Sequence, residues 1–523
     1  MAKCIMVQGT SSNAGKSILV AALARIYSRK GYKVAPFKSQ NMSLNSYTTK
    51  EGGEIAIAQV LQAEACDIEP SIHMNPILLK PKGNLISQVI IQGKAVGDMN
   101  FYDYQHEYRE KALKAIKESL SILKENYDLI IIEGAGSPAE INLRKEDLAN
   151  MEIAHLSNSD VILVADIDRG GVFASIAGTF SLLDEKDRNR LKAVVINKFS
   201  GNLKILQPGI DEIEKIVNVP VLGVLPYDPS LHLPEEDSAS LFEHKFKQDK
   251  EITIGVMRLP KIANFTDIDP FEFEEDVGIN IIELNKKGQE EIEKVDAIII
   301  PGTRSSADDM IELKNTGFDT KIIQMSKEIP IVGICGGYQI LGKKIIDNNK
   351  KESKHKEVNG LGLLDIETEF KEKEKIVKQS KGTISIDKED KIAKDSKLYQ
   401  EVFKNIEGEK ITGYELHEGT TNVKNTPTII NIKKGVGNSK ETKTDGAIEG
   451  NVFGSYLHGI FHNYNLRNAF LNHIRRKKGL KEKNTSDPYE EKKGYSLDRL
   501  AEIVEENIDL KFIDKLIENN DNE

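Results

Sequence analysis

The sequence contains no tryptophan and only three cysteines among its 523 residues. Cys4, Cys66 and Cys335 have neither the spacing of metal ligands nor the even pairing of a disulfide scaffold, so both classes are excluded. No apolar run approaches the roughly 20 residues that a membrane-spanning helix needs. The N-terminus also lacks the long apolar core and cleavage site of a secretory signal. We therefore expect a cytoplasmic protein that has no membrane partner.

The chain also lacks an excess of basic residues. Its 72 lysines and arginines are outnumbered by 82 aspartates and glutamates, which gives a formal charge of −10. Because a nucleic-acid-binding protein needs a basic face, we expect no nucleic-acid partner. The hydrophobic share of 39% and the charged share of 29% are typical of a globular protein. A chain of this length predicts two or more domains.

The first part of the chain alternates apolar runs with helical patterns. Helical spacing is seen at residues 15–31 and 108–127. The apolar runs, rich in Ile, Val and Leu, lie at residues 3–9, 33–38, 128–136, 160–168, 192–199 and 219–228. Uninterrupted runs of this kind are typical of parallel strands that helices cover on both faces. The sequence thus predicts an α/β domain with a parallel sheet over residues 1–230.

A second α/β series follows a stretch of proline and mixed charge. Its apolar runs lie at residues 252–260, 279–284, 296–303 and 330–337, and strand character returns near 452–457. We place a linker at residues 231–250, a second domain at 251–470, and a charged helical tail at 471–523. The Lys/Glu-rich segments 343–356 and 371–398 are expected to be solvated loops and exposed faces.

A phosphate-binding loop is predicted between the first strand and the first helix, in the sequence GTSSNAGKS. Backbone N–H groups and the N-terminus of a helix can converge on an anion there. Five residues separate Gly9 from Gly15, one more than in the common pattern, and the longer loop resembles that of the dethiobiotin synthetase group of ATP-dependent enzymes. Lys16 would reach the β and γ phosphates of ATP, and Ser17 would bind Mg²⁺. The nucleotide-binding residues that we predict in the loop are Gly9, Thr10, Asn13, Ala14, Gly15, Lys16 and Ser17.

Polar residues follow the later strands of the same domain. Glu133 lies at the carboxyl end of an apolar run, where open α/β sheets bind ligands, and we interpret it as a carboxylate on the Mg²⁺ side. A carboxylate that caps the next turn is the alternative. Asp166 and Asp168 could face the same crevice. Asn197 and Lys198 resemble a contact to adenine, with a plain turn as the alternative.

Cys335 lies between an apolar strand and a predicted helix, in the sequence GICGGYQILG. A nucleophile on such a turn is directed into a cleft, and the helix that follows favours the thiolate. Small neighbours let a substrate approach, and the N–H after the nucleophile can stabilise an oxyanion. A thiol also needs a base. His458 follows a strand-like run in the same domain and is our choice, with His417 and His462 as competitors.

These motifs carry a resemblance to a known family. GICGGYQILG and GSYLHGIF are similar to the class I glutamine amidotransferase domain of the cobyric acid synthase and cobyrinic acid a,c-diamide synthase group. PFKSQNMSLNS, GGEIAIAQVLQAEA, HMNPILLKPKG and SQVIIQGK resemble the cobyric acid synthase branch. The resemblance covers about residues 3–470. It implies an N-terminal ATP-dependent domain joined to a C-terminal class I glutamine amidotransferase domain.

The family resemblance also implies site roles and an activity. Cys335 would be the glutaminase nucleophile and His458 its base, Gln339 would line the glutamine pocket, and Gly302 and Gly336 would form the oxyanion hole. Many class I domains carry a glutamate two residues after the histidine, where this chain has Ile460, so the residue that orients His458 is open, with Glu418 as a candidate. The implied reaction is the ATP- and glutamine-dependent amidation of the b, d, e and g carboxylates of adenosylcobyrinic acid a,c-diamide, in cobalamin biosynthesis.

The corrinoid substrate is large and polyanionic. Lys38, Gln40, Asn41 and Asn45 follow the second strand and could bind its carboxylates and amides, with an ordinary polar loop as the alternative. Three other functions remain open at this point. They are a sibling amidoligase (an a,c-diamide synthase or a cell-wall amidotransferase), a P-loop ATPase switch with a silent thiol domain, and a corrinoid carrier without catalysis. The sequence does not indicate an oligomeric state.

Overall fold

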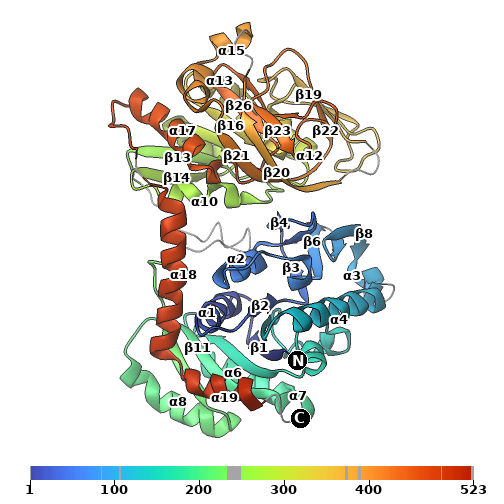
Figure 1. The fold of residues 1–523 in the computed structure, drawn as a ribbon, viewed down its shortest axis with the longest axis vertical. Coiled ribbons are helices and arrows are strands. Elements are labelled where there is room, and N and C mark those ends of the chain that lie inside the picture. The colour runs from blue at the N-terminus through green and yellow to red at the C-terminus, as the bar shows by residue number, and fades with distance from the viewer. Residues whose placement is uncertain are drawn as a thin grey trace. The chain divides into compact units, whose positions relative to one another are not determined.

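A computed structural model describes residues 2–83, 85–104, 108–231, 249–371, 375–386, 390–484 and 486–519 (Figure 1). The chain folds into two compact units. The N-terminal unit contains residues 1–43, 53–234 and 492–523, and the C-terminal unit contains residues 44–52 and 235–491. The predicted linker at 231–250 lies mostly outside the described residues. The exchange of residues 44–52 between the units was not predicted.

The N-terminal unit is built on a six-stranded parallel sheet in the order β12-β11-β10-β1-β9-β2. Its strands are β1 (Lys3–Gly9), β2 (Val34–Phe37), β9 (Leu129–Glu133), β10 (Asp160–Asp166), β11 (Leu191–Phe199) and β12 (Val221–Pro226). Five of these strands lie within apolar runs that the sequence predicts to form strands. The sixth, β11, begins one residue before its predicted run. The prediction of a parallel α/β sheet is confirmed.

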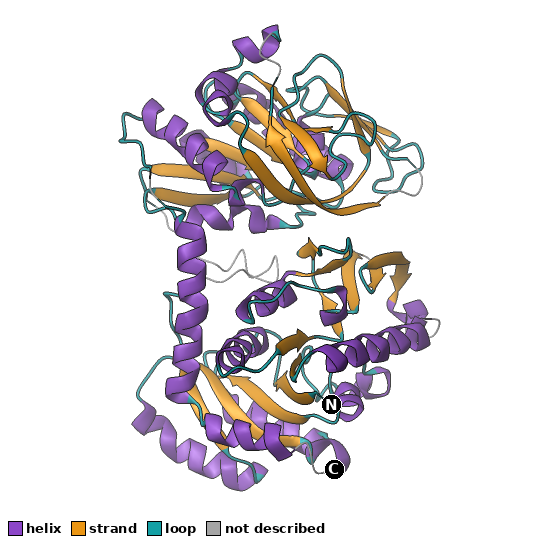
Figure 2. Cartoon of the chain, viewed as in Figure 1, coloured by secondary structure: helices purple, strands orange, loops and turns teal. Residues whose placement is uncertain are grey.

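Helices cover both faces of this sheet, and two apolar cores result (Figure 2). On β1, Met6 belongs to one core, whereas Ile5 and Val7 belong to the other. The helices are α1 (Lys16–Arg29), α2 (Ile57–Ala65), α3 (Phe101–Asp103), α4 (Arg109–Asn126), α5 (Met151–Ser157), α6 (Val172–Leu182), α7 (Glu185–Arg188) and α8 (Leu203–Val217). Burial on both faces explains why the strands are apolar at most central positions instead of alternating.

A smaller sheet precedes α4 in the same unit, in the order β3-β6-β7-β8. It contains β3 (Gln40–Met42), β6 (Ile77–Gly83), β7 (Ile86–Ile91) and β8 (Lys94–Asn100). The sequence predicts no strands in residues 40–100. β3 has only three residues and β8 is exposed at most positions, so neither carries a strong apolar signal.

The predicted C-terminal tail is not one separate segment. Residues up to 491 belong to the C-terminal unit, and those from 492 onward belong to the N-terminal unit. In α18 (Pro488–Asn507) and α19 (Leu510–Asn519), apolar side chains that include Val504, Ile513 and Ile517 enter the core around α1. The charge of these helices lies on one face, because both are amphipathic. Among the described residues, no helix has the length and apolarity needed to cross a bilayer.

The C-terminal unit has its own six-stranded sheet, in the order β14-β13-β15-β16-β26-β25. The strands are β13 (Ile252–Met257), β14 (Val277–Ile282), β15 (Ala297–Ile300), β16 (Ile331–Ile334), β25 (Ala447–Glu449) and β26 (Val452–Ser455). All are parallel except β25, which pairs with β26 in the antiparallel direction. The carboxyl ends of β15, β16 and β26 therefore meet at one edge of the sheet.

Two further sheets complete this unit, in the orders β18-β17-β19-β22 and β21-β20-β23-β24. They contain β17 (Lys344–Ile346), β18 (Glu357–Asn359), β19 (Ile366–Glu369), β20 (Lys375–Ile384), β21 (Lys410–Glu418), β22 (Thr420–Val423), β23 (Ile430–Lys434) and β24 (Thr444–Asp445). The expectation of solvated loops at 371–398 is wrong for β20. Ile376, Ser380 and Ile384 are buried on one face of this strand, while its lysines lie between them.

The helices of the C-terminal unit are α10 (Asp269–Glu272), α11 (Lys286–Glu291), α12 (Ser306–Asn315), α13 (Phe318–Met325), α14 (Gly336–Leu341), α15 (Lys391–Asp395), α16 (Lys397–Glu401) and α17 (Tyr464–Lys477). The short strands β4 (Ser46–Thr48) and β5 (Glu54–Ala56) lie on either side of the point where the chain re-enters the N-terminal unit.

Candidate functional site

The predicted phosphate loop connects β1 to α1 in the N-terminal unit. β1 ends at Gly9 and α1 begins at Lys16. The Lys16 ammonium donates to the carbonyl oxygen of Ser11 at 2.8 Å and to that of Gly136 at 3.1 Å. A Cβ atom on Gly9 would lie only 3.0 Å from Nζ of Lys16. The loop therefore curls around the amine that is expected to meet phosphate.

Gly15 and Asn197 meet at the other side of this loop. Gly15 has a φ of +101°, and a Cβ atom there would lie 1.9 Å from Nδ2 of Asn197. Nδ2 of Asn197 donates to the carbonyl oxygen of Ala14 at 3.0 Å. Asn13 also has a positive φ, and the N–H of Thr10 donates to Val164 of the neighbouring strand. The predicted nucleotide-binding residues are thus brought together at one end of β1.

Glu133 is the centre of a buried polar cluster at the carboxyl end of β9. Its Oε1 accepts hydrogen bonds from Oγ of Ser17 and from Nζ of Lys38, both at 2.8 Å. The Glu133 side chain is almost completely buried, and so is that of Lys38. A carboxylate in contact with a cation and a hydroxyl is stable at such a position.

Two glutamines that the sequence analysis did not single out complete this cluster. Nε2 of Gln62 donates to Oε2 of Glu133 at 2.5 Å, and Nε2 of Gln59 lies 3.4 Å from the same oxygen. Both belong to α2 and are fully buried. Their spacing of three residues places them on one helix face. Two amides three residues apart within the mostly apolar run of α2 are a signal that could have identified them.

The chemistry of this cluster fits a magnesium ion. Mg²⁺ is usually bound through one or two carboxylates and the phosphates of a substrate, with waters, and not by a cage of protein ligands. Ser17 and Glu133 offer one hydroxyl and one carboxylate beside the phosphate loop. The described part of the chain contains no group of three or more His, Cys, Asp or Glu residues that could hold a metal ion by itself.

The other polar residues predicted in this unit form hydrogen bonds with neighbouring residues. Oδ2 of Asp166 accepts from Nζ of Lys198 at 2.9 Å, and its Oδ1 accepts from the N–H of Asp168. Oε1 of Gln40 accepts from the hydroxyl of Tyr104 at 2.7 Å. Nδ2 of Asn41 donates to Oε1 of Gln59 at 3.0 Å, which joins Asn41 to the cluster around Glu133.

Asn45 lies in the other unit. Its Oδ1 accepts a hydrogen bond from the N–H of Phe265 at 3.3 Å, and its side chain is 1% exposed. The structure thus brings Lys38 and Asn41 to the Glu133 cluster, whereas it uses Asn45 inside the C-terminal unit. A role of these residues in binding substrate stays a prediction.

In the C-terminal unit, Cys335 occupies the turn between β16 and α14. Its φ of +53° and ψ of −108° are rare for a residue that carries a side chain. Such conformations cost free energy and concentrate at active sites. The N–H of Cys335 donates to the carbonyl oxygen of Ser455 on β26 at 2.8 Å, which fixes the turn. The predicted nucleophile elbow is present, although α14 is only six residues long.

Close approach of backbones around the elbow requires glycine. A Cβ atom on Gly337 would lie 1.9 Å from the carbonyl oxygen of Ile300 at the end of β15. A Cβ atom on Gly336 would lie 2.5 Å from Cγ2 of Thr303. On Gly302 it would lie 2.9 Å from Cε1 of His458. Gly302 therefore lies beside the predicted base, and Gly336 lies against the residue that follows Gly302.

His458 follows β26 and is fully buried. Its Nδ1 lies 2.7 Å from Oδ2 of Asp267, and no other described residue forms a hydrogen bond with its Nε2 in this geometry. Burial opposes charge on the imidazole, but the charges of Asp267 and Cys335 and the hydrogen bond to Asp267 outweigh it and raise the pKa of His458 to about 10. A protonated imidazole beside a sulfur stabilises a thiolate, which is the nucleophilic form.

Asp267 is the residue that orients His458, and the sequence analysis missed it. It lies in the short 3₁₀ helix η4 (Phe265–Ile268), 191 residues before the histidine. The backbone carbonyl of Glu418, our sequence candidate, instead accepts from Nε2 of Gln339 at 3.0 Å. No local pattern in the sequence indicates a contact over so many residues.

The competing histidines have other partners. Nε2 of His417 lies 3.3 Å from Oε2 of Glu415, and its ring stacks on Tyr456 with centroids 3.7 Å apart. Nε2 of His462 lies 3.1 Å from the carbonyl oxygen of Thr266. These partners are Glu415 and a backbone carbonyl, whereas the charge of Cys335 acts on His458 to raise its pKa.

Gln339 lies one turn after the nucleophile on α14 and is 3% exposed. Its Nε2 donates to the carbonyl of Glu418 and, at 3.2 Å, to the hydroxyl of Tyr456. These contacts fix the amide beside the elbow, where the glutamine pocket is predicted. Cys335, Gln339 and His458, together with Gly302 and Gly336, thus form one cluster in the C-terminal unit.

Comparisons with known proteins agree with this geometry. Residues 253–466 match a family described as the CobB/CobQ-like glutamine amidotransferase domain, and residues 5–241 match the CobQ/CobB/MinD/ParA nucleotide binding domain. A "Probable cobyric acid synthase" of Methanothermobacter thermautotrophicus is 58% identical over 99% of each chain. A protein of the same name from Methanosphaera stadtmanae is 55% identical over 98% of this chain and 99% of its own. The "Cobyric acid synthase" of Clostridium tetani is 43% identical over 98% of each chain.

The solved structures that match this chain resemble it only weakly. PurLQS from Thermotoga maritima is 17% identical and covers 48% of this chain and 97% of its own, with a TM-score of 0.29. A likeness at this level carries no argument. The fold and the two sites define a glutamine-dependent amidoligase with a nucleotide-binding domain. Within that class, the chain belongs to the cobyric acid synthase family, because curated relatives match it over nearly its whole length.

Proposed function

We propose that this protein converts adenosylcobyrinic acid a,c-diamide into adenosylcobyric acid by amidating its b, d, e and g carboxylates, with ATP, Mg²⁺ and glutamine. The observation that carries the proposal is that relatives named cobyric acid synthase match this chain over nearly its whole length. The amidated acid is a small-molecule corrinoid, and we propose no nucleic-acid or membrane partner. The three cysteines are free and buried, which supports the proposed cytoplasmic location.

The N-terminal unit would activate the acid. A carboxylate repels nucleophiles, so the γ-phosphoryl group of ATP is transferred to one of its oxygens, ADP leaves, and an acyl phosphate forms. Lys16 would neutralise charge on the transferred group, as phosphoryl transfer requires. Ser17 and Glu133 would hold Mg²⁺, which neutralises phosphate charge when it is bound. Lys38 lies against Glu133 and offers a positive charge near the anionic substrate.

The C-terminal unit would release ammonia from glutamine. The thiolate of Cys335 attacks the side-chain carbonyl carbon, and the backbone N–H groups of Gly302 and Gly336 stabilise the oxyanion. The C–N bond then breaks, and the leaving nitrogen takes the proton of His458 and departs as ammonia. Water hydrolyses the thioester to glutamate while His458 accepts its proton. Asp267 holds the imidazole in the required orientation throughout.

Ammonia then displaces phosphate from the acyl phosphate and leaves an amide. Free ammonia is largely protonated at neutral pH, and ammonium is not a nucleophile. An enzyme that generates ammonia next to its use avoids this loss. This requirement explains why a glutaminase and an ATP-dependent synthetase occur in one chain.

The test is mass spectrometry of the a,c-diamide after incubation with the protein, ATP, Mg²⁺ and glutamine. We expect products in which the carboxylates are replaced by amides in succession until none of the four positions remains free. Amidation of the a and c positions of cobyrinic acid instead would identify an a,c-diamide synthase. ATP hydrolysis without any amide product would favour a P-loop switch.

The Cys335→Ala variant separates the two half-reactions. It should lose glutamine-dependent synthesis yet retain synthesis from added ammonium salt, because the N-terminal cluster is unchanged. Cys66→Ala is the matched control, since this buried cysteine lies outside both clusters and should leave both activities near those of the wild type. Full glutaminase activity in Cys335→Ala would show that Cys335 is not the nucleophile.

A further inference from the structure

The predicted nucleophile and base of the C-terminal unit follow two neighbouring strands of one sheet. Cys335 follows β16, and His458 lies three residues after β26. These strands pair in the parallel direction, with Ile334 opposite Ser455. Hydrolysis requires the sulfur and the imidazole at one fixed separation, because a misplacement of about 1 Å can cost about 100-fold in rate. The contacts that hold the ends of these two strands together are therefore important for the reaction.

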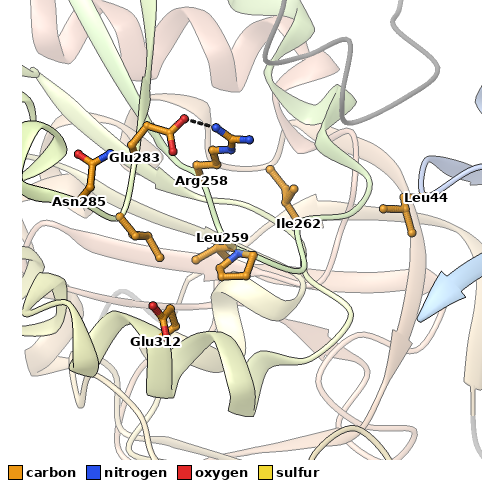
Figure 3. A pocket seen from close by; sticks show the side chains of 9 residues that line it. Leu44, Arg258, Leu259, Ile262, Glu283, Asn285 and Glu312 are labelled. Carbon is orange, nitrogen blue, oxygen red and sulfur yellow. Dashed lines mark hydrogen bonds and ion pairs between the residues drawn. The ribbon is translucent and has the colours of Figure 1, made fainter. Parts of the chain in front are cut away.

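The pocket shown in Figure 3 lies toward the opposite edge of this sheet, at the carboxyl ends of β13 and β14. It has a volume of about 310 Å³. Its lining includes Arg258 after β13 and Glu283 after β14, which form an ion pair. Neither Cys335 nor His458 lines this pocket. The contacts that join the ends of β16 and β26 lie on the other side, toward β25.

A single carboxyl group, that of Asp445, lies at the end of β26. Asp445 is the last residue of β24 and is fully buried. Its Oδ2 accepts a hydrogen bond from Oγ of Ser455, the last residue of β26. The backbone N–H of Tyr456 donates to both carboxylate oxygens at 3.2 Å. The carboxylate thus holds two successive residues at the point where β26 ends.

Ser455 connects this carboxylate to the nucleophile. Its carbonyl oxygen accepts the N–H of Cys335 at 2.8 Å. This N–H belongs to the residue whose φ of +53° is rare for a residue with a side chain. Such a conformation persists only where the surrounding structure holds it. The hydrogen bond from Cys335 to Ser455 is part of that hold, and Asp445 fixes Ser455 through its side chain.

The hydroxyl of Ser455 also connects the carboxylate to the base. The N–H of Leu457 donates to Oγ of Ser455 at 3.0 Å, and the next residue is His458. A hydroxyl has one hydrogen to donate and two lone pairs that accept. That of Ser455 donates to Asp445 and accepts from Leu457. Residues 455–457 are therefore bound to one carboxylate immediately before the imidazole.

Tyr456 extends the same network to the predicted glutamine pocket. Its hydroxyl accepts a hydrogen bond from Nε2 of Gln339 at 3.2 Å. Gln339 also donates to the carbonyl oxygen of Glu418 at 3.0 Å, and that contact does not involve Asp445. Loss of the Asp445 carboxylate should therefore disturb the reacting sulfur and imidazole more than the pocket that binds glutamine.

A carboxyl group at this buried position is unfavourable by itself. Burial raises the pKa of Asp445 from 3.8 to about 7, and the charge of Glu415 acts in the same direction. Hydrogen bonds from Ser455 and Tyr456 oppose this rise. A well-packed apolar side chain of similar volume would avoid the penalty. Carboxyl groups perturbed in this way are found especially at functional sites, which agrees with a role in placing the groups that react.

We propose that Asp445 is a positioning residue for glutamine hydrolysis, which fixes Cys335 and His458 relative to each other through residues 455–457. This inference rests on the proposed function, in which these two residues are nucleophile and base. Asp445 acts on Cys335 through the carbonyl of Ser455 and on His458 through Leu457. Without the carboxylate, the end of β26 would shift, and the separation of the sulfur from the imidazole would shift with it.

The experiment measures kcat and KM for glutamine hydrolysis by the full chain. In Asp445→Ala we expect kcat to fall by about 100-fold, the effect of a small misplacement of reacting groups. KM should stay within about threefold of the wild type, because Gln339 keeps its contact with the carbonyl of Glu418. Asp445→Asn keeps the shape and an acceptor for the N–H of Tyr456, so it should recover most of the lost rate.

Alkylation by iodoacetamide reports on the placement of the imidazole in the absence of glutamine. The thiolate is the form that reacts, and a neighbouring imidazolium, here that of His458, favours it. Cys4 and Cys66 are internal references, because burial raises the pKa of their thiols to about 11 and about 12. In Asp445→Ala, the alkylation of Cys335 should slow toward the rates of these two cysteines.

Asp276→Asn is the matched control. Asp276 is another buried carboxylate of the same unit, but it pairs with Arg475. Its loss should lower stability while the folded variant keeps the wild-type kcat and the wild-type alkylation of Cys335. An Asp445 with a merely structural role would behave in the same way. Wild-type kcat and alkylation in folded Asp445→Ala would therefore overturn the inference.

If Asp445→Ala does not fold, the test passes to Ser455→Ala, which removes the hydroxyl between Asp445 and the N–H of Leu457. A fall in kcat of more than about fivefold with KM unchanged, the equivalent of one hydrogen bond, would support the inference, and a smaller fall would overturn it. The proposed function is distinguished by the wild type. A wild type that releases no glutamate from glutamine would overturn both, whereas an active wild type with unaffected variants would overturn the positioning alone.

Discussion

Nδ1 of His458 lies 2.7 Å from Oδ2 of Asp267, and the backbone N–H of Gly459 donates to the other oxygen of the same carboxylate. The carboxylate therefore fixes both the ring and the backbone that carries it. A carboxylate in this position holds the tautomer of the imidazole and stabilises the imidazolium form. The position after the histidine that usually supplies this group is Ile460, so Asp267 takes the role from another part of the chain.

Asp267→Asn should lower kcat for glutamine hydrolysis by about 10³- to 10⁴-fold, as expected when the aspartate of a catalytic triad becomes an amide. The amide keeps the shape but removes the charge and permits the wrong tautomer. Synthesis from ammonia should persist. The control is Glu275→Gln, which changes an exposed carboxylate nearby in sequence. A loss of less than about threefold would show that Asp267 does not orient the catalytic base.

The same pair makes a prediction for alkaline pH. Because the pKa of His458 is raised from 6.5 to about 10 in the folded protein, the stabilisation from this group is complete below pH 6.5 and is lost as the pH rises through about 10. Asp267→Asn removes the main charge that raises it. We expect the Tm of the wild type to fall more between pH 7 and pH 10 than the Tm of the variant. Equal falls in differential scanning calorimetry would contradict this assignment.

The strands of both sheets could be predicted because burial on both faces leaves a strong local signal. β1 and β9 are short runs that are mostly apolar and rich in Ile and Val, which favours buried strands over helices. The cysteine and glycines that follow β16 predict the elbow for a similar reason. A tight turn between a strand and a helix requires small residues directly beside the nucleophile, so the pattern is visible in neighbouring residues. The signals that succeeded are therefore local.

The parts that could not be predicted depend on contacts between distant residues. Asp267 meets His458 across 191 positions, and nothing near either residue indicates the other. Residues 44–52 have the composition of an ordinary loop, so their exchange into the C-terminal unit leaves no trace in sequence. The lysines of β20 hide the alternation of its apolar and polar positions, so the sequence does not predict this strand. The many charged residues around α19 likewise hide its apolar face, which packs in the core of the N-terminal unit.

Glu133→Gln should abolish amidation whether glutamine or ammonia supplies nitrogen, while basal glutamine hydrolysis continues. The carboxylate is the charged partner that Ser17 and the proposed Mg²⁺ share. Stabilisation by a metal ion is worth several kcal/mol, so we expect a loss of at least about 100-fold in kcat. A shift of the Mg²⁺ titration to higher concentration would support the assigned role. Glu140→Gln, at an exposed position, should behave as the wild type.

The buried carboxyl of Asp309 contacts Thr303, which follows Gly302, and makes stability depend on pH. Burial raises the pKa of its carboxyl from 3.8 to about 7, against hydrogen bonds from Thr303 and from the N–H of Lys261. Folding therefore favours the neutral carboxyl. The contribution of Asp309 to the free energy of unfolding is greatest below pH 3.8 and is lost as the pH rises through about 7. Asp309→Asn should remove this dependence, with a smaller fall in Tm between pH 5 and pH 8 than in the wild type. An unchanged fall would show that another group titrates.

Arg475 is completely buried in the C-terminal unit and depends on Asp276. Nε and Nη2 of Arg475 donate to the two carboxylate oxygens of Asp276, at 2.7 and 2.9 Å. Removing one partner of a buried ion pair leaves an uncompensated charge and costs about 3–5 kcal/mol. We expect Asp276→Asn to destabilise the C-terminal unit by this amount in urea unfolding followed by a probe in that unit.

Acid provides an independent check on the same pair. Burial raises the pKa of Asp276, but the hydrogen bonds and charges of Arg475 and Lys483 outweigh it and lower this pKa to about 2. The stabilisation is thus complete above pH 3.8 and is lost as the pH falls through about 2, so the wild type and Asp276→Asn should converge in stability toward pH 2. Lys483→Ala is the matched control, because Lys483 lies 2.9 Å from the same carboxylate but is one-third exposed. An ion pair with a solvent-exposed partner contributes at most about 1 kcal/mol, so a loss in Lys483→Ala equal to that in Asp276→Asn would contradict the assignment to the buried pair.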